Sequence, residues 1–370
     1  MTEIADEITK PTLLVDLVKV NKNIDRMVKR ARDNDVILRP HFKTHQSSEI
    51  GQLFRERNVD AITVSSVGMA EYFAGNGWRD ITVAFPVNPR QLEQINGLAS
   101  QIKLNILFES LNSYLTVGKK LANGIGAWIK IDTGYHRSGI LWNDLEQISR
   151  LTRNIDENRG LYFEGILTHP GHTYKADSVE EIRKIFHETV TRMDLVKSEL
   201  ATQGYEVKVS IGDTPGCSIV EKFGPVDEIR PGNFVFYDLM QEKLGACSES
   251  DIAVVAACPV VAKNLNRNEI VIYGGAVHLS KEYLINPDGK PYHGRITYPI
   301  SKGWTDAISD CWLSSISQEH GVIAASNELL ERVGVGDLLL VLPIHSCLTA
   351  NLMGKYLTTE GHTIDMARLL

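Results

Sequence analysis

Short apolar runs alternate with longer amphipathic stretches over the first 240 residues of this 370-residue chain. Near-continuous apolar runs rich in β-branched residues are typical of strands covered on both faces, as in a parallel sheet. Eight runs fit this description: 36–42, 61–66, 80–86, 103–109, 126–132, 162–169, 206–212 and 233–238. The stretches between them repeat apolar residues at helical spacing. Eight strands alternating with helices predict a (β/α)8 TIM barrel, although an open doubly wound sheet would give a similar rhythm.

The pattern changes after about residue 245. Short β-rich runs separated by Gly, Pro and Asn replace the long helical stretches, which predicts a mainly antiparallel β domain. We therefore expect a barrel at residues 11–243 and a C-terminal β domain at residues 244–370.

Charge and composition narrow the class of protein. The formal net charge is −7, which argues against nucleic acid as a partner because phosphate binding needs a basic surface. No apolar run approaches the roughly 18 residues that span a bilayer, and the acidic, polar N-terminus does not have the pattern of a signal peptide. Five cysteines lie in the second half of the chain, and this odd number indicates reduced thiols. We expect a cytoplasmic protein without a membrane or nucleic-acid partner.

Lys43 stands out where the first predicted strand ends, in RPHFKTHQ. The active site of such a barrel lies at the C-terminal ends of its strands. A lysine that is desolvated there, with Arg39 nearby, can lose its proton and act as the nucleophile that forms a Schiff base. An ordinary surface lysine is the alternative, and the flanking His41, Thr44 and His45 weaken it.

Glycine-rich turns follow the seventh predicted strand, as GDTPG, and approach the eighth, as RPGN. Glycine lets backbone N–H groups approach an anion, and the Thr214 hydroxyl adds a donor, so these turns indicate a phosphate site. After the fifth strand, DTGYHRSG places Arg137 where it could bind a phenolate or carboxylate. A salt bridge at the barrel rim is the other reading of Arg137.

The segment PIHSCLTANL contains His345 and Cys347. Two residues apart on a strand end, their side chains leave the same face. Imidazole and thiolate together suit zinc better than magnesium or calcium. A metal ion with two protein ligands keeps coordination positions open for water or substrate. A buried cysteine beside an unrelated histidine is the alternative explanation of this sequence.

Taken together, PHFKTH, DTGYHRSG, THPGHTY, GDTPG, RPGN and HSCLTA resemble the D-threonine aldolase/D-serine dehydratase family. This family belongs to the alanine-racemase-like, fold-type III group of pyridoxal phosphate enzymes. The resemblance covers almost the whole chain, in the order of the family's motifs. It implies a barrel with an appended β domain, a homodimer with active sites near the subunit interface, and packing of residues 1–10 with the β domain.

The resemblance also implies roles for individual residues around pyridoxal 5'-phosphate. Lys43 would be the Schiff-base lysine, Arg137 would lie near the phenolic oxygen of the cofactor, and Tyr174 would face its pyridine nitrogen. The residues that would hold the phosphate are Thr214, Gly232 and Asn233.

By the same resemblance, His345 and Cys347 would bind a divalent metal. The aldolases of the family tend to carry HxD at this motif and the zinc-dependent dehydratases HxC. Cys347 therefore favours dehydration of a small-molecule D-amino acid with zinc; an aldolase would use Mn²⁺ or Mg²⁺. The sequence leaves open whether the substrate is D-serine, D-threonine or D-3-hydroxyaspartate.

Three other activities stay open. An aldolase of the D-threonine type would need a base for the β-hydroxyl, and either His169 or His172, after the sixth strand, could serve. A racemase would use a tyrosine from the β domain as its second base. The tyrosines there include Tyr273, Tyr283, Tyr292 and Tyr298. A non-catalytic pyridoxal-phosphate-binding protein is the last alternative, although such proteins lack both the β domain and the metal pair.

Overall fold

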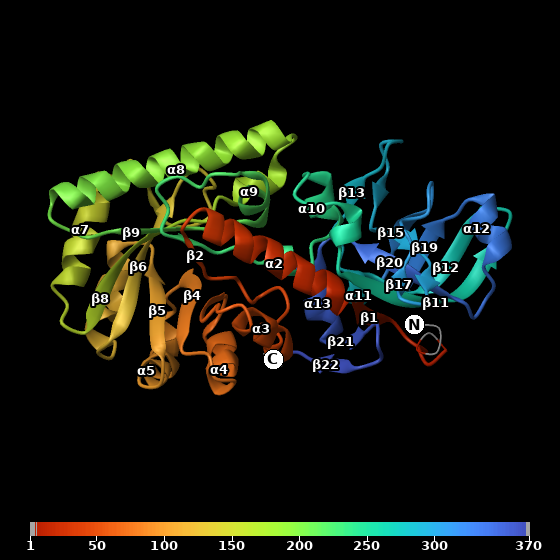
Figure 1. Ribbon diagram of the computed structural model, residues 1–370, viewed down its shortest axis with the longest axis horizontal. Helices are drawn as coiled ribbons and strands as arrows, with labels where there is room; N and C mark the ends of the chain where they lie inside the picture. The colour runs from red at the N-terminus through yellow and green to blue at the C-terminus, as the bar shows by residue number, and fades with distance from the viewer. Residues whose placement is uncertain (1–3, 5, 368–370) are drawn as a thin grey trace.

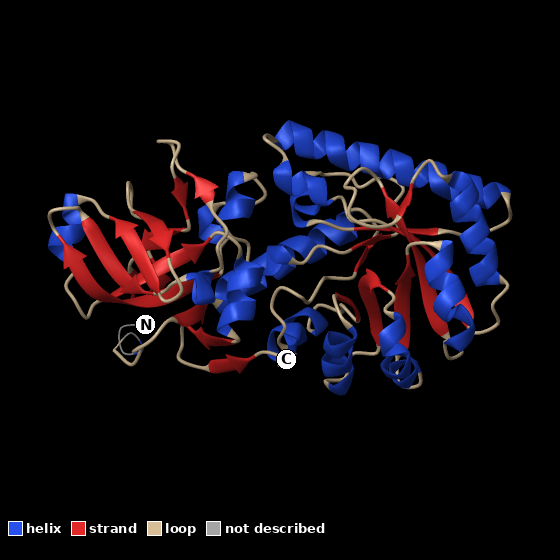
Figure 2. Cartoon of the chain, turned by 180° about the vertical axis from the view of Figure 1, so that it is seen from behind, coloured by secondary structure: helices blue, strands red, loops and turns tan. Residues whose placement is uncertain are grey.

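The computed structural model describes residue 4 and residues 6–367, and it places a β/α barrel and a β domain side by side (Figures 1 and 2). The barrel strands are all parallel, in the order β2-β10-β9-β8-β6-β5-β4-β3. Their bounds are β2 (Ile37–Leu38), β3 (Ala61–Val64), β4 (Asp80–Pro86), β5 (Lys103–Phe108), β6 (Ile125–Asp132), β8 (Leu161–Leu167), β9 (Lys208–Ile211) and β10 (Glu228–Ile229), with the short β7 (Ile140–Leu141) beside β6.

A bridge between His41 and Thr63 nearly closes this sheet between β2 and β3. The predicted (β/α)8 barrel is thereby confirmed, and the open doubly wound sheet is excluded. Helices surround the barrel in Figure 2. They are α2 (Leu17–Asp33), α3 (Ser48–Arg55), α4 (Val67–Gly75), α5 (Leu92–Ala99), α6 (Leu111–Val117), α7 (Leu145–Asp156), α8 (Val179–Thr202), α9 (Thr214–Ile219) and α10 (Leu239–Lys243).

Short 3-10 helices occupy several loops: η1 (Pro89–Gln91), η2 (Gly118–Lys120), η3 (Gly171–Lys175), η4 (Asn233–Val235) and η5 (Glu249–Asp251). One of them corrects the sequence prediction. Residues 233–238, predicted as the eighth strand, begin with η4, and the eighth strand is instead β10. The segment is apolar because Phe234 and Phe236 are buried in the core. Hydrophobic periodicity alone cannot distinguish such a buried segment from a buried strand.

The β domain is built on a second sheet, in the order β12-β19-β18-β15-β20-β11-β1-β21-β22, and β11 also pairs with β12. All pairs in it are antiparallel except β1 with β21, which confirms the predicted antiparallel β domain. The strands are β1 (Thr12–Val15), β11 (Val254–Asn264), β12 (Glu269–Tyr273), β15 (Gly294–Thr297), β18 (Trp312–Ile316), β19 (His320–Ala324), β20 (Leu338–Pro343), β21 (Lys355–Thr358) and β22 (Thr363–Asp365).

Two small hairpins and three helices complete this domain. The hairpins are β13 (Leu284–Ile285) with β14 (Pro291–Tyr292), and β16 (Pro299–Ile300) with β17 (Gly303–Trp304); the helices are α11 (Ala276–Leu279), α12 (Asn327–Arg332) and α13 (Ser346–Met353).

The N-terminal end of the chain differs from the predicted domain boundary. β1 lies between β11 and β21, so residues 12–15 extend the sheet of the β domain rather than the barrel. The chain then crosses to the barrel through α2, which Asp16 caps by accepting hydrogen bonds from two backbone N–H groups. Of residues 1–10, which we expected to pack with the β domain, residues 1–3 and 5 lie outside the described part.

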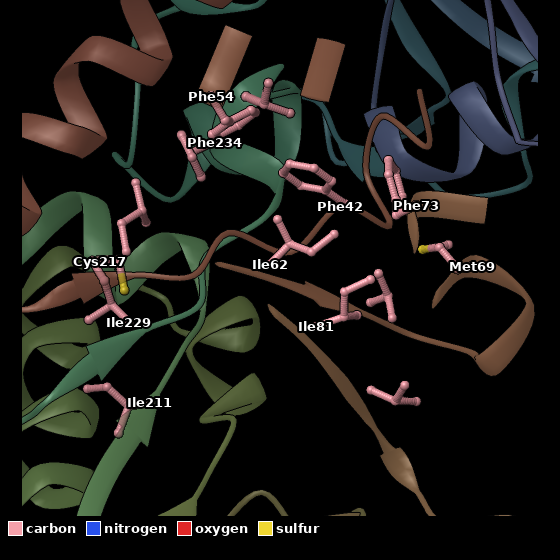
Figure 3. Packing of buried hydrophobic residues seen from close by; sticks show 14 of the residues in the cluster. Phe42, Phe54, Ile62, Met69, Phe73, Ile81, Ile211, Cys217, Ile229 and Phe234 are labelled. Carbon is pink, nitrogen blue, oxygen red and sulfur yellow. The ribbon is translucent and has the colours of Figure 1, made fainter. Parts of the chain in front are cut away.

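An aromatic cluster supports the segment that follows β2 (Figure 3). Phe42 is fully buried, and its ring lies 5.0 Å from the rings of Phe73 and Trp78 and 5.1 Å from that of Phe54. Burial of one such ring contributes about 1.5–3 kcal/mol. The cluster therefore fixes the backbone of the residue next to Lys43.

Candidate active site

A cavity of about 510 Å³ opens at the C-terminal ends of the barrel strands and extends to the start of α13 in the β domain. Most of the residues singled out in the sequence line it: Lys43, Arg137, His169, Tyr174, Gly232, Asn233, His345 and Cys347. Thr214 lies immediately beside it, next to the lining residue Asp213. His172 is not among the lining residues.

Lys43 projects into this cavity from the turn after β2, and its side chain is exposed there. Its backbone N–H donates to His41 Nδ1 at 3.3 Å. Arg39, which we expected to act on Lys43, instead forms ion pairs with Glu228 and Asp80, each at 2.5 Å. Side-chain alternation would place residues 39 and 43 on one face only along a continuous strand, and the chain leaves the extended conformation at the turn over residues 42–45.

Lys130 is a cavity residue that the sequence reasoning missed. It lies on β6, and only 6% of its surface is exposed. Burial and the charges of Arg230 and Arg137 lower its pKa to about 7. A lysine within the otherwise buried run IKID was the available sequence signal. Since perturbed titratable groups in a cavity cluster at functional sites, we add Lys130 to the candidate residues.

The wall formed by the two glycine-rich turns carries unpaired polar atoms. Tyr174 Oη accepts a hydrogen bond from the Thr214 backbone N–H at 3.2 Å. Thr214 Oγ1 and Asp213 Oδ1 are buried without a protein partner. A Cβ on Gly232 would lie 2.8 Å from the backbone oxygen of His41, so only glycine allows the turn at Gly232 to approach the segment after β2. The buried, unpaired Thr214 hydroxyl is a donor beside a close-packed glycine turn, and this combination fits an anionic group such as a phosphate.

The two candidate histidines differ in position. His169 Nδ1 lies 2.5 Å from the Gly212 carbonyl oxygen and donates to it, which leaves Nε2 as an acceptor. Burial and the nearby Lys130 and Lys43 keep the pKa of His169 well below its ordinary value, so the ring is neutral. The ring of His172 instead stacks on Tyr135 at 6.3 Å. Only His169 of the pair therefore offers a base to the cavity.

His345 and Cys347 both line the cavity, at the start of α13. Burial would lower the pKa of His345, but hydrogen bonds with Cys347 and Glu282 outweigh it and raise the pKa to about 11. Burial likewise opposes ionisation of Cys347, yet the contact with His345 and the charge of Lys43 lower the pKa of the thiol. The contact between the two side chains therefore favours sharing of a proton between the imidazole and the thiol, and a bound metal ion would displace that proton.

A buried carboxylate, Asp238, connects the His345–Cys347 segment to the glycine-rich turn that carries Asn233. Asp238 Oδ2 accepts from the Ser346 N–H at 2.9 Å and from Asn233 Nδ2 at 2.6 Å. Asn233 Nδ2 also lies 3.5 Å from Cys347 Sγ. The side-chain amide of Asn233, which we expected at the phosphate, is therefore committed largely to the metal motif, and only its buried Oδ1 lacks a protein partner.

The residues present fit both groups that the resemblance implies. An amine, an arginine and a turn with an unpaired buried hydroxyl suit pyridoxal phosphate. Imidazole and thiolate suit a soft or borderline divalent ion such as zinc. Among the described residues no group of three or more His, Cys, Asp or Glu side chains is arranged to hold a metal, so protein ligands alone would leave coordination positions open.

A parallel β/α barrel with a cavity lysine after its first strand, followed by a β domain, defines the alanine-racemase-like class. Residues 15–239 match the family described as "Alanine racemase, N-terminal domain", and residues 253–359 match the one described as "Putative serine dehydratase domain". The chain belongs to the alanine-racemase-like family that includes D-serine dehydratase. The resemblance seen in the sequence is thereby confirmed.

Individual relatives agree with this assignment. A D-serine dehydratase of Dictyostelium discoideum is 31% identical, over 96% of this chain and 95% of its own length. The solved D-threo-3-hydroxyaspartate dehydratase from Delftia sp. HT23 superposes with a TM-score of 0.89 at 25% identity, covering 98% of each chain. A D-threonine aldolase from Filomicrobium marinum, with a TM-score of 0.83 at 19% identity over 98% of this chain and 96% of its own, shares the fold.

Proposed function

We propose that this protein is a pyridoxal-phosphate- and zinc-dependent lyase that dehydrates a D-β-hydroxy amino acid, D-serine or D-3-hydroxyaspartate, to a keto acid and ammonia. One observation carries the proposal: Lys43 shares a single cavity with the histidine–cysteine pair His345 and Cys347. The lysine fits chemistry at Cα, and the thiolate-containing pair fits chemistry at the β-hydroxyl.

Lys43 would hold the cofactor and then take the α-proton. Bound pyridoxal phosphate supplies an electron sink for negative charge at Cα. The Lys43 amine lies at the mouth of β2, where it can exchange with the substrate amine and act as a general base, a role worth about 10²–10⁴-fold in rate. Arg137, also on the cavity wall, would bind an anionic oxygen of the cofactor, and Tyr174 would orient the turn at Thr214 through their hydrogen bond.

His345 and Cys347 would hold the zinc ion, which supplies Lewis acidity for a leaving hydroxyl group. Loss of the α-proton and of the β-hydroxide removes one water from the substrate. The released enamine then takes up one water and yields a keto acid and ammonia, so atoms balance without an oxidant or reductant.

Retro-aldol cleavage, as in a D-threonine aldolase, is the second candidate. His169 favours it, because it is neutral and keeps Nε2 free as an acceptor in the cavity. Such a base would remove the β-hydroxyl proton while the Cα–Cβ bond breaks. His172 would need to leave its stacked position on Tyr135 to compete for this role.

The test is a product assay with D-serine, D-threonine and D-3-hydroxyaspartate in the presence of pyridoxal phosphate and zinc. Dehydration gives keto acid and ammonia from the preferred substrate. Glycine plus aldehyde would show an aldolase and overturn the proposal. L-Serine formed without loss of ammonia would show a racemase, and no turnover with any D-β-hydroxy amino acid would indicate a binding protein.

We propose further that the enzyme is a cytoplasmic homodimer. All five cysteines are free thiols, which suits a reducing compartment. In the described part of the chain, no helix has both the length and the apolar character needed to cross a membrane. Phe85 lines the cavity although 57% of its surface is exposed, and a second subunit covering this mouth would bury it. Light scattering of the purified protein tests the dimer.

A further inference from the structure

We propose that Glu282 is a positioning residue for the metal site: it holds the His345 ring by its Nδ1–H and so presents Nε2 to the metal ion. This inference rests on the proposed function, since it concerns the same pair of ligands. It adds a residue from the loop between α11 and β13, which neither the sequence motifs nor the cavity lining includes.

The contact between the two side chains is direct. Glu282 Oε2 lies 3.1 Å from His345 Nδ1, and the two side chains are 37% and 28% exposed. A carboxylate only accepts, so Nδ1 must carry the proton and donate. The ring then keeps its Nε2 lone pair for a metal, and a rotation that swapped the two nitrogens would lose the hydrogen bond.

The loop that carries Glu282 begins at a residue with an unusual backbone conformation and is held by two hydrogen bonds. Ser280, at the end of α11, has φ 68° and ψ 177°, a conformation that costs a non-glycine residue about 1–3 kcal/mol. Its hydroxyl accepts from the Glu282 N–H at 3.3 Å. His293 Nδ1 lies 3.0 Å from the Glu282 carbonyl oxygen and donates to it. The strained backbone at Ser280 and the two hydrogen bonds to the Glu282 backbone therefore fix where the Glu282 side chain begins.

The same loop is attached to the helix that bears the ligands. The Thr349 hydroxyl, on α13, donates to the carbonyl oxygen of Leu279 at 3.4 Å. The carboxylate and the imidazole therefore belong to one packed unit, α11 with α13. Asp238 holds the backbone at the start of α13 through Ser346, and Glu282 holds the imidazole ring of His345. One carboxylate thus fixes the backbone position, and the other fixes the rotation of the ring.

Two other roles for Glu282 fit the geometry less well. A third metal ligand would have to gather with His345 and Cys347, and no such group of three is present among the described residues. A solvent-exposed ion pair would contribute only about 0–1 kcal/mol to stability and nothing to metal binding. A hydrogen-bonded partner of a ligating histidine, in contrast, usually changes metal affinity by about 10–100-fold.

The experiment measures the zinc dissociation constant by competition with a chromophoric chelator, on wild type and on the variants Glu282→Ala and Glu282→Gln. We expect Glu282→Ala to bind zinc about 10–100-fold more weakly. Glu282→Gln should fall between it and wild type, because the amide oxygen still accepts from Nδ1 but carries no charge. Cofactor absorbance and thermal unfolding of the metal-free proteins should not change, since Glu282 is partly exposed.

The matched control is Glu319→Gln, which removes a carboxylate 3.8 Å from a different histidine, His278 Nε2, and should bind zinc as wild type does. Zinc binding by Glu282→Ala within about twofold of wild type would overturn the inference while leaving the proposed function intact. Failure of the wild-type protein to bind zinc at all would instead overturn the proposed function and the inference with it.

Discussion

The Thr44 hydroxyl lies 3.3 Å from Cys347 Sγ. The residue that follows the candidate Schiff-base lysine therefore contacts a candidate metal ligand 303 positions away in the chain. The barrel and the β domain meet at this contact, next to the cavity that Lys43 shares with His345 and Cys347. From this contact we expect the Thr44 hydroxyl to lower the pKa of the Cys347 thiol.

In the metal-free protein we expect Thr44→Val to raise the pKa of the Cys347 thiol, because a hydrogen bond from Thr44 stabilises the charged form of the thiol. The rate of Cys347 alkylation as a function of pH measures this. Thr44→Ser, which keeps the hydroxyl, should behave as wild type; an unchanged pH profile in Thr44→Val would show that the hydroxyl does not act on the thiolate.

Lys130 should lower the free energy of unfolding of the cofactor-free protein. Its pKa in the folded state, about 7, lies below the ordinary value of 10.5, so the folded state disfavours the proton that the unfolded chain accepts. The destabilisation is full below about pH 7 and disappears as the pH rises towards 10.5. Lys130→Met should therefore raise the free energy of unfolding at pH 7, measured in urea, and this gain should shrink at higher pH.

We assign Lys130, on the cavity wall, a contact with an anionic oxygen of the bound cofactor. Loss of this contact in Lys130→Met should weaken cofactor binding by about tenfold. Titration with pyridoxal phosphate followed by absorbance measures this. A Lys130→Met protein that is less stable than wild type at pH 7, or that binds the cofactor equally well, would contradict the role assigned to Lys130.

Gly232→Ala should abolish tight cofactor binding. The added Cβ would lie 2.8 Å from the His41 backbone oxygen, and since backbone cannot yield cheaply, the turn beside Lys43 must shift. We expect at least a tenfold loss in affinity for pyridoxal phosphate. Gly97→Ala is the matched control, because nothing lies within 4 Å of its added Cβ on α5; it should bind normally. Equal affinities in the two variants would contradict the predicted phosphate turn.

Asp251 should stabilise the junction of the two domains in a pH-dependent way. Arg26 on α2 donates to both of its oxygens, at 2.7 and 3.1 Å. Burial would raise the pKa of Asp251, but hydrogen bonds from Arg26 and Ser248 outweigh it and hold the pKa well below the ordinary 3.8. The contribution is therefore present above about pH 4 and is lost as the pH falls towards the lowered value.

Asp251→Asn should reduce the free energy of unfolding at pH 7 by about 1–3 kcal/mol, because solvent partly screens the exposed Arg26. Urea unfolding at several pH values tests this. The difference from wild type should narrow as the pH falls below 4. A difference that is the same at pH 3 and pH 7 would show that the ion pair does not contribute.

The barrel could be predicted from sequence because its central strands are long and apolar; β4, for example, has the predicted bounds, Asp80–Pro86. The eighth strand could not be predicted, since β10 has only two residues and so short a strand shows no repeating pattern of apolar positions. Lys130 was detectable as a charge inside an apolar run. Glu282 was not, because it contacts His345 across 63 residues of sequence, and no local pattern encodes such a contact.

Reduction of the holoenzyme with borohydride tests the claim that Lys43 carries the cofactor. Borohydride fixes a Schiff base as a stable secondary amine, and peptide mapping then locates the phosphopyridoxyl group. We predict a single label on Lys43, and none in Lys43→Ala. A label on Lys130 or another lysine, or no label in a protein that contains pyridoxal phosphate, would contradict the claim.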